Sequence, residues 1–569
     1  MISSKDSRRL LGQHFTPEPL ADFVCSLGVR SPADRVLDPA CGDGAFLRAA
    51  LRRLWALGAP AAAGQVSGFE IDEACAAAAR EAAPGAAVTA GDFFRRPPEP
   101  LFDAIIGNFP FVRQELLSEG KGFLKDVVRG EWLFDYPEVD RLTGRADLYL
   151  YFVFHAARFL KDGGRMAVIT GNSWLHVPYG KVLREFLLSK LGLVSVFESR
   201  AEVWFPHTSV NAAISLIERK GPAREVTFVQ LGKPLGPGQE GLPEGASARR
   251  VPAGPLRSRD NWSCYLRAPQ VYFDALERAG ARLVPLARLA SIRRGVTTGL
   301  NRFFLLEKAE AERLGLEPEF LVPAVASLKG IESLSIRPEH ARHCLLVVDR
   351  ARDGLRGTRM LDCIESFERD AGAALRSPTL RGREPWYRLS LPEPADFLVP
   401  RFRRERHFSP LNPHGIAVAD TVFAVRARER RHATLCCAAA NSTLFHFCAE
   451  VTGRDNMGGG FITTYGPEIR ALPVPAPACL EPFAAETGQA LAELCRRPVL
   501  TMARELERGD RRRLDEIIWR AIGVPLTMLD DLCGEFAGLL ARRKAHGQMA
   551  GARASSGGPG SAGDVPNDV

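Results

Sequence analysis

Short apolar runs alternate with amphipathic patterns from about Leu11 to Lys220. The runs predict strands at 35–37, 65–71, 102–106, 166–170, 194–198 and 212–218. Apolar residues at helical spacing between them predict helices at 45–57, 72–83 and 148–160. Because strands and helices alternate, the pattern predicts an α/β fold with a Rossmann-like, doubly wound sheet.

Beyond this alternating region the pattern changes, and it predicts a chain of several parts. A first domain is expected over 1–231, and the Gly-, Pro-, Ala- and Arg-rich segment 232–260 is expected to be a linker. A mixed α+β region is expected over 261–478, followed by a helical segment over 479–545. The small and polar residues of 546–569 predict a disordered tail.

Composition narrows the class of protein only a little. The net charge of +8 and the pI of about 8.9 suit a protein that meets a polyanion, although many other proteins are equally basic. The 12 cysteines are scattered and form no C-x-x-C pair, so neither a zinc site nor a disulfide framework is expected. No apolar run suits a membrane span or a signal peptide, and a cytoplasmic protein is expected.

A glycine-containing turn follows the first predicted strand, in the sequence Val36-Leu-Asp-Pro-Ala-Cys-Gly-Asp-Gly-Ala-Phe46. In a doubly wound sheet, this turn is where a nucleotide-like ligand binds. The third glycine of a dinucleotide motif is missing, because Leu47 takes its place. An acid before the turn favours a cationic ligand group over a pyrophosphate. The candidate ligand-binding residues here are Asp38, Ala40, Cys41, Gly42 and Gly44; the alternative is a structural turn capped by Asp38.

Two further acids follow at the ends of the next predicted strands. Glu70, beside Ile71, is placed to accept hydrogen bonds from ribose hydroxyls, and Asp72 is expected to cap the next helix. Asp92 could accept from a purine amino group, with Phe93 packing on the base. Each acid alone is as well explained by a helix cap or a solvated carboxylate, but their order and spacing together favour a nucleoside site.

A buried strand then ends in Asn108-Phe-Pro-Phe111. With the preceding motifs, this segment resembles the amino-methyltransferases of DNA, in particular the TaqI-like class of N6-adenine methyltransferases of type II restriction–modification systems. The family tetrapeptide is Asn or Asp, two prolines and an aromatic residue, so this chain departs from it at Phe109. The resemblance implies S-adenosyl-L-methionine as cofactor and Asn108, Phe109, Pro110 and Phe111 as catalytic residues.

The resemblance extends along most of the chain. Gly12–Pro17 resembles the N-terminal cofactor motif of the family and adds the candidate residues Gln13, His14, Phe15, Thr16 and Pro17. The segments Arg145–Leu150 and Asp162–Ile169 resemble the next family blocks. Val203–His207 resembles the segment that places an aromatic ring, here Phe205, against a base flipped out of the duplex.

The resemblance also implies how the reaction proceeds. The adenine amino nitrogen is a poor nucleophile and is buried by pairing, so the base must leave the stack. The Asn108 side-chain oxygen and the Phe109 backbone carbonyl would accept the two amino protons, while Phe111 and Phe205 would contact the base. Proline fixes φ at the second position, whereas Phe109 has more freedom, so a weakened or inactive site is an alternative.

In the region 261–478, two basic segments resemble the DNA-recognition part of the family. The first lies in Ile292–Phe304 and the second in Val399–Arg406, with Gly458–Thr463 resembling the later part of the region. The candidate DNA-binding residues are Arg293, Arg294, Thr297, Thr298, Asn301, Arg302, Arg401, Arg403 and Arg404. An Arg-rich solvated face is the alternative for any one of them.

The resemblance therefore implies a prokaryotic, site-specific DNA adenine-N6 methyltransferase that acts on double-stranded DNA in a restriction–modification or related defence system. The region 1–231 would be its catalytic domain and 261–478 its target-recognition domain. No metal is expected, and a cleaving partner is expected to be a separately encoded restriction endonuclease. The alternatives are an RNA or protein-glutamine methyltransferase, a catalytically weakened homologue, and a DNA-binding protein without activity.

Overall fold

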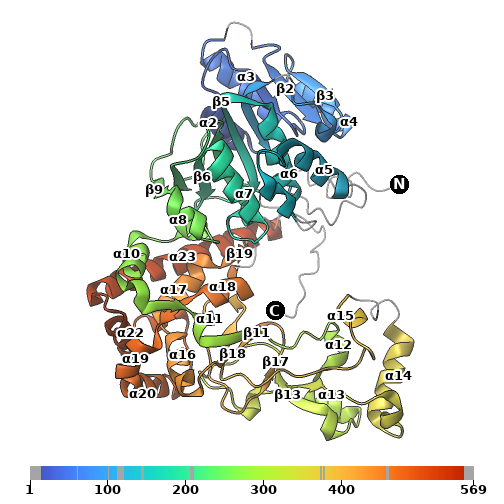
Figure 1. Cartoon of the computed structure of the whole chain (residues 1–569), viewed down its shortest axis with the longest axis vertical. Helices are drawn as coiled ribbons and strands as arrows, with labels where there is room; N and C mark the ends of the chain where they lie inside the picture. Colours follow the sequence, from blue (N-terminus) through green and yellow to red (C-terminus); the bar gives the residue numbers. More distant parts are fainter. Residues whose placement is uncertain are drawn as a thin grey trace. The chain divides into compact units, whose positions relative to one another are not determined.

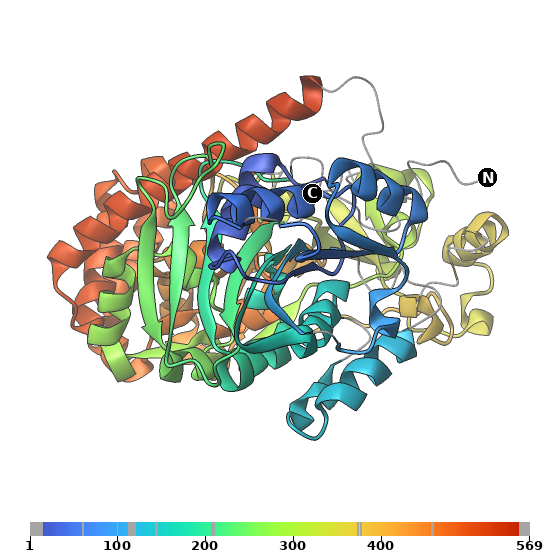
Figure 2. The ribbon, with the colours of Figure 1, turned by 90° about the horizontal axis from the view of Figure 1, so that it is seen from above.

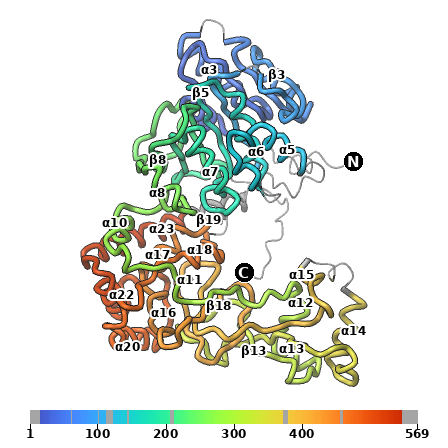
Figure 3. Tube along the Cα trace, viewed as in Figure 1, coloured from blue at the N-terminus to red at the C-terminus, as the bar shows by residue number. Residues whose placement is uncertain are grey.

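The chain forms two compact units, Met1–Ala268 and Pro269–Val569, which Figures 1 and 3 trace from blue to red. This computed structural model describes residues 15–59, 62–99, 101–111, 121–142, 146–205, 211–371, 375, 378–456 and 460–556. Among the described residues, no helix is both long enough and apolar enough to span a membrane.

The first unit is built on a sheet of nine strands in the order β3-β2-β1-β4-β5-β7-β6-β8-β9 (Figure 2). Neighbouring strands are parallel, except that β7 runs against β5 and β6, and β9 runs against β8. The strands are β1 (Val36–Asp38), β2 (Val66–Glu70), β3 (Ala87–Ala90), β4 (Phe102–Asn108), β5 (Leu160–Gly171), β6 (Leu193–Ser199), β7 (Ala212–Glu218), β8 (Glu225–Leu231) and β9 (Ser247–Pro252). The chain order reverses between β1 and β4, as it does in a doubly wound sheet.

Helices cover the sheet of the first unit. They are α2 (Glu18–Gly28), α3 (Ala45–Ala56), α4 (Glu73–Ala82), α5 (Lys121–Trp132), α6 (Leu148–Ala156), α7 (Gly180–Phe186), α8 (Ala253–Ser258) and α9 (Ser263–Arg267). The apolar faces of α2 and α3 pack on the central strands in one buried cluster, which includes Phe23, Leu47 and Ile106. Helix α6 is buried on nearly all sides and reads as apolar throughout. The predicted Rossmann-like fold class is confirmed.

The segment 232–260, for which the sequence predicted a linker, contains a strand and a helix of the first unit. Residues of β9 pair antiparallel with β8, and α8 follows directly, so the first unit extends to Ala268. Strand β9 is an edge strand, and most of its side chains are exposed or half-buried. It therefore lacks the apolar alternation from which a strand is recognised in a sequence.

The second unit combines small sheets with helices, as the prediction of a mixed α+β region implied. Its strands are β10 (Leu283–Pro285), β11 (Ala290–Arg294), β12 (Leu305–Glu307), β13 (Leu321–Val325), β14 (His343–Leu346), β15 (Phe397–Pro400), β16 (Phe402–Arg403), β17 (Ala417–Val418), β18 (Val422–Ala427), β19 (Arg454–Asn456), β20 (Phe461–Thr463) and β21 (Pro473–Pro475). The sheets are β11-β18-β15, β12-β14-β13-β17, β16-β20-β19 and β10-β21.

The helices of the second unit occur along its whole sequence and are most frequent toward its end. They are α10 (Gln270–Ala279), α11 (Leu286–Leu289), α12 (Asn301–Phe304), α13 (Lys308–Arg313), α14 (Arg359–Ala371), α15 (Pro378–Arg381), α16 (Ala433–Ala439), α17 (Thr443–Thr452), α18 (Gly466–Ala471), α19 (Pro477–Leu480), α20 (Ala484–Cys495), α21 (Met502–Glu505), α22 (Gly509–Ile522) and α23 (Leu526–Ser556).

Two boundaries predicted for this part of the chain, at 479 and 546, also differ from those in the structure. Strand β21 pairs with β10, and α20 packs on α16, so no separate unit begins at 479. Helix α23 continues to Ser556, through residues 546–556 that were expected to belong to the tail. The residues 541–552 include four Ala and two Arg, with one Lys, one Gln and one Met, and these residue types favour helix despite the two intervening glycines.

Candidate active site and nucleic-acid interface

The acids and the amide singled out in the sequence lie at one edge of the sheet. Strand β1 pairs in parallel with β2 on one side and with β4 on the other. Because Asp38, Glu70 and Asn108 are the last residues of these three strands, they meet at the carboxyl edge. The first strand–helix turn adjoins the same edge, at the point where the strand order reverses.

The glycine turn is held to β2 by Glu70, which is 6% exposed. One carboxylate oxygen of Glu70 accepts from the Gly42 backbone N–H at 2.9 Å, and the other accepts from Asp72 N–H at 3.0 Å. Gly44 begins α3 with a φ of 86°, a left-handed conformation that glycine adopts without strain. Asp72 caps α4 by accepting from Cys75 N–H at 2.9 Å, which confirms its predicted role.

Asp38 is the most unusual acid at this edge because it is fully buried. Its Oδ1 accepts from Ala40 N–H at 3.0 Å, while Oδ2 is buried and has no hydrogen-bond partner among the described residues. Burial is the main cause that raises the pKa of Asp38 to about 8; the Ala40 N–H bond opposes this rise and the nearby Glu70 carboxylate adds to it. A buried carboxylate with an unused oxygen is matched by a cationic donor such as an ammonium group.

Gly107, which was not among the predicted site residues, leaves the space that the Asp38 carboxylate occupies. A Cβ atom on Gly107 would lie 2.7 Å from Asp38 Oδ1, and the φ of Gly107 is 154°. Any larger residue would push the carboxylate away from the Ala40 N–H. The only signal in the sequence was a glycine directly before the candidate catalytic asparagine.

The two apolar residues Ile71 and Phe93, both candidate cofactor-binding residues, lie in different environments. Ile71 is 62% exposed at the end of β2, where a flat ligand could cover it. Phe93 is only 3% exposed, and its ring packs among Phe69, Phe94, Phe152, His155 and Phe159. The ring of Phe93 therefore supports the Asp92 turn from inside and does not offer a face at the surface.

Asp92 itself begins a short 3-10 helix, Phe93–Arg95, and its Oδ1 accepts from Phe94 N–H at 3.0 Å. Its Oδ2 lies 3.4 Å from the guanidinium of Arg95. This is the capping role that the sequence left open, and it does not prevent the half-buried carboxylate from also accepting from a ligand.

The N-terminal motif reaches the candidate catalytic asparagine. Asn108 Nδ2 donates to Thr16 Oγ1 at 3.3 Å, which orients the amide. Pro17 caps α2, and Phe15 is 61% exposed. Gln13 and His14, from the same motif, lie outside the described residues, as do Arg145, His207 and Gly458.

Phe109, the departure from the family tetrapeptide, is anchored by both its backbone and its ring. Its N–H donates to Ile169 O at 3.0 Å, which extends the β4–β5 pairing by one residue. Proline, which lacks an N–H, could not make this bond. The ring is 1% exposed and lies 5.4 Å from Phe152, centroid to centroid. The freedom expected at this position is thus restrained by neighbouring structure.

The two aromatic residues expected to contact a base meet each other. The rings of Phe111 and Phe205 are 5.7 Å apart, with an angle of 72° between their planes. Phe111 is half-buried and directly follows Pro110, whereas Phe205 is 4% exposed. The structure therefore brings both residues to the loop that follows Asn108.

In the second unit, the two predicted basic segments lie on either side of one strand. Strand β18 is the middle strand of its sheet, with β11, which carries Arg293 and Arg294, on one side. On the other side is β15, which leads into Arg401. Arg293 and Arg404 are exposed, and Arg294 is exposed and donates to Asp420 Oδ2 at 2.7 Å.

The remaining candidate residues of these segments differ in how far they are exposed. Arg302 and Asn301 are exposed at α12, and the Arg302 guanidinium lies 5.1 Å from the Phe367 ring. The Arg401 guanidinium is half-buried and stacks between the rings of Phe402 and Tyr465.

Two of the predicted DNA-binding residues lie in the interior. Arg403 is 0% exposed, its Nη1 donates to Thr464 Oγ1 at 2.6 Å, and burial lowers its pKa to about 10. Thr298 is 1% exposed, and its hydroxyl donates to Asn301 Oδ1. The prediction of direct DNA contact is wrong for these two, because neighbouring residues along an extended segment alternate between the surface and the core.

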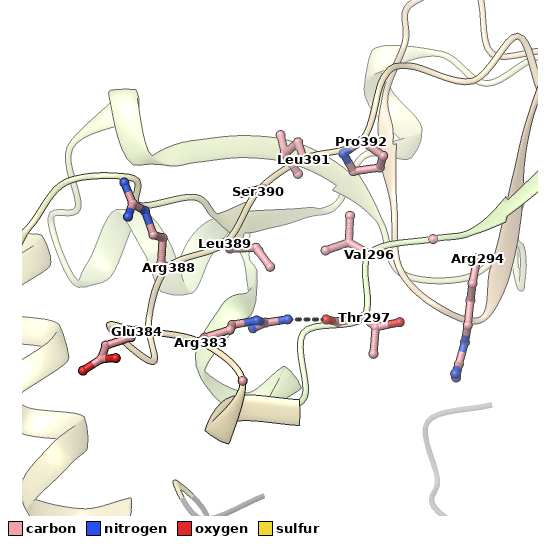
Figure 4. A pocket seen from close by; sticks show the side chains of 12 residues that line it. Arg294, Val296, Thr297, Arg383, Glu384, Arg388, Leu389, Ser390, Leu391 and Pro392 are labelled. Carbon is pink, nitrogen blue, oxygen red and sulfur yellow. Dashed lines mark hydrogen bonds between the residues drawn. The ribbon is translucent and has the colours of Figure 1, made fainter. Parts of the chain in front are cut away.

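An open groove of about 680 Å³ lies beside the first basic segment (Figure 4). One wall is Arg294–Thr297, and the other is the loop that includes Arg383, Glu384 and Arg388. Arg383 donates to the carbonyl oxygens of Thr297 at 2.6 Å and Thr298 at 2.7 Å, so it joins the walls. No local pattern in the sequence singles out this loop.

Among the residues that the structure describes, no group of three or more His, Cys, Asp or Glu side chains is arranged to hold a metal ion.

Comparison with known proteins gives two family models along the chain. The model described as Eco57I restriction-modification methylase matches residues 89–205, which include the Asn108 loop. The model of the C-terminal domain of the type II methyltransferase M.Eco57I matches residues 261–508, within which lie both basic segments.

Curated relatives agree with the family models. The chain is 26% identical over 407 residues to the type II methyltransferase M.XamI of Xanthomonas campestris, covering 68% of this chain and 71% of that protein. It is 31% identical over 220 residues to the type II methyltransferase M.TthHB8I of Thermus thermophilus, covering 38% of this chain and 46% of that protein. The chain thus spans less than half the length of the second relative.

Among solved structures, the type IIL restriction-modification enzyme MmeI in complex with DNA resembles this chain in fold, with a TM-score of 0.62 and 16% identity. The match covers 96% of this chain and 80% of that one. These comparisons do not single out the TaqI-like class, which stays a prediction. Taken with the site at the sheet edge, the two family models and the curated relatives support a type II restriction–modification methylase, that is, a DNA methyltransferase.

Proposed function

We propose that the chain transfers a methyl group from S-adenosyl-L-methionine to the exocyclic N6 of an adenine flipped out of double-stranded DNA. The observation that carries the proposal is the meeting of Asp38, Glu70 and Asn108 at one sheet edge. These residues would supply a buried acid for an ammonium group, an acid for ribose hydroxyls and an amide acceptor, all at the same edge of the sheet.

The cofactor would be held by residues whose environment fits it. The unused buried oxygen of Asp38 suits the amino group of its methionine part. Glu70 suits the ribose, the exposed side chain of Ile71 suits one face of the adenine, and Asp92 suits its amino group. When bound, the cofactor supplies an electrophilic methyl group on a positively charged sulfur.

The protein's own part in the reaction is to prepare the target nitrogen. Asn108 Oδ1 and the Phe109 carbonyl would accept the two amino protons and favour a tetrahedral nitrogen with an available lone pair. Thr16 holds the amide, and the Phe109 N–H bond to Ile169 O directs the adjacent peptide. Preorganised acceptors of this kind stabilise the charge that develops in the transition state without further rearrangement.

Aromatic contacts would hold the target base in place. Phe111 is placed to stack on one face, and the near-perpendicular ring of Phe205 is placed to meet the edge of the base. Stacking contributes about 1–3 kcal/mol per base, which is comparable with the cost of removing a base from the duplex.

The second unit would recognise the DNA sequence. The exposed arginines at β11 and Arg404 suit phosphates, while the groove beside β11 presents Glu384, Arg388 and Ser390 as donors and acceptors for base edges. In the cytoplasm of a prokaryote, the modification would protect sites from a separately encoded restriction endonuclease.

The test is transfer of labelled methyl groups from S-adenosyl-L-methionine to DNA, RNA and protein offered separately to the purified chain. Label is expected in double-stranded DNA, and Asn108→Ala is expected to reduce transfer by about a hundredfold or more while cofactor binding is retained. Label in RNA or protein alone would overturn the proposed substrate. Full transfer by Asn108→Ala would overturn the proposed mechanism.

A further inference from the structure

His155 is a buried histidine that the proposed chemistry does not use. It lies on α6, its side chain is 1% exposed, and both ring nitrogens have partners. Nε2 is 3.1 Å from the carbonyl oxygen of Phe93, and Nδ1 is 2.6 Å from Oε1 of Glu131. Because a carbonyl oxygen only accepts, Nε2 carries a proton and donates it to Phe93 O.

Glu131 is held in position by the end of α5. The neighbouring Trp132 is buried, and its Nε1–H donates to Phe154 O on α6 at 2.8 Å. This bond fixes the spacing of the two helices beside the Glu131–His155 pair. The Glu131 side chain is 16% exposed, so its carboxylate is mostly shielded from water and its hydrogen bond to His155 is correspondingly strong.

The ring of His155 also packs against two aromatic rings of the turn that follows Asp92. It lies 4.6 Å from the Phe93 ring and stacks on Phe94 at 5.1 Å with an interplanar angle of 20°. The carbonyl that accepts its proton belongs to Phe93, the residue directly after Asp92. Glu131, His155 and the Phe93 carbonyl thus form a chain of hydrogen bonds that ends at the Asp92 turn.

From this geometry we propose that Glu131 and His155 are positioning residues that fix the Asp92 turn for recognition of the adenine amino group of the cofactor. The inference rests on the proposed function, because it assigns Asp92 to the cofactor adenine. Neither residue touches the ligand; His155 fixes the Phe93–Phe94 peptide, whose N–H donates to Asp92 Oδ1, and Glu131 fixes the His155 ring. A hydrogen-bonding partner behind a ligand-contacting residue typically determines how well that residue is aimed.

The test measures cofactor discrimination, because overall stability alone would not change it. The probes are S-adenosyl-L-homocysteine and S-inosyl-L-homocysteine, which carries an oxygen in place of the adenine amino group. For the unaltered chain, calorimetry is expected to show binding of the adenosyl compound tighter by about tenfold or more, because a hydrogen bond to a charged group is lost with the inosyl compound.

His155→Phe is the informative variant, since phenylalanine retains ring packing but makes neither hydrogen bond. Its preference for the adenosyl compound is expected to fall to about threefold or less, with the larger loss in adenosyl affinity. Glu131→Gln retains the size of the side chain and is expected to give an intermediate preference. Phe159→Leu is the matched control, because Phe159 packs 5.1 Å from His155 without hydrogen-bonding it; its preference should be unchanged.

The outcomes separate the inference from the function on which it rests. If the unaltered chain binds neither compound, the proposed function fails. If it prefers the adenosyl compound and folded His155→Phe retains that preference, the positioning role is wrong while the proposed function stands. An equal loss of preference in Phe159→Leu and His155→Phe would show general loosening of the aromatic cluster, which also overturns the inference.

Discussion

The sheet edge of the first unit and the basic segments of the second differ in how strictly the backbone determines the place of each residue. At the sheet edge, Asp38, Glu70 and Asn108 end adjacent parallel strands, so strand pairing alone brings them together. In the second unit, Arg403 is fully buried while Arg404 is exposed. Motifs at strand ends therefore predict a site, whereas basic runs predict a region without saying which residues face the ligand.

The most severe expected effect tests how tightly the sheet edge is packed. Gly107→Ala places a Cβ 2.7 Å from Asp38 Oδ1, and it does so at a φ of 154°. Methyl transfer is expected to fall by about a hundredfold or more, because displacement by about an ångström is enough for such a loss. Gly130→Ala on α5 is the control, since a Cβ there has no neighbour within 4 Å. Equal activity of both variants would show that the edge tolerates displacement.

The buried acid gives a pH-dependent prediction. The folded protein holds a proton on Asp38 up to a pKa of about 8, whereas the unfolded chain releases it near the usual value of 3.8. The stability of the ligand-free protein is therefore expected to fall as pH rises from about 4 to about 8. Asp38→Asn should remove this dependence and raise the unfolding temperature at pH 8 by about 2 °C or more.

The same variant should bind the cofactor about tenfold to a hundredfold more weakly, because a charge-assisted hydrogen bond is lost. Thermal scans over pH, with and without the cofactor, measure both effects. A variant that is less stable at pH 8 yet binds the cofactor normally would contradict the role given to Asp38.

Phe109 tests whether the family motif or its local surroundings determine activity. Phe109→Pro restores the family tetrapeptide but removes the N–H that donates to Ile169 O and the ring that packs near Phe152. We expect the turnover rate to fall by about tenfold, since the adjacent carbonyl loses its support. Phe109→Leu retains the N–H and most of the apolar volume, and its rate should stay within about threefold of the unaltered chain. A higher turnover rate in Phe109→Pro would mean that the family tetrapeptide, and not the local contacts of Phe109, determines activity.

The smallest effect distinguishes the two neighbouring arginines of the second unit. Arg404→Ala is expected to weaken DNA binding several-fold and to lower the salt dependence by about one phosphate contact. Arg403→Ala is expected to destabilise the second unit by about 1–3 kcal/mol, because the buried side chain leaves a cavity and the Thr464 hydroxyl loses its donor. Binding titrations at several salt concentrations, with thermal unfolding, separate these cases; a reduced salt dependence in stable Arg403→Ala would reverse the assignment.

The sequence predicted strands β1, β2 and β4 to β7 and helices α3, α4 and α6 of the first unit, because buried strands are short apolar runs and the helices between them are amphipathic. It did not predict strands β3 and β8. It missed β9 because an edge strand of polar residues has no such pattern. It also overlooked the Glu131–His155 pair, whose members come from different helices and have no fixed spacing. Contacts between distant segments, such as Arg383 with Thr297, depend on tertiary folding and leave no local signal.

The most direct test of the account is base-resolution sequencing of DNA from cells that express the unaltered chain or Asn108→Ala, in a host that lacks other methyltransferases. The account predicts N6-methyladenine at one short recurring sequence with the unaltered chain and none with the variant. Methylation of cytosine, or adenine methylation that persists in Asn108→Ala, would contradict it.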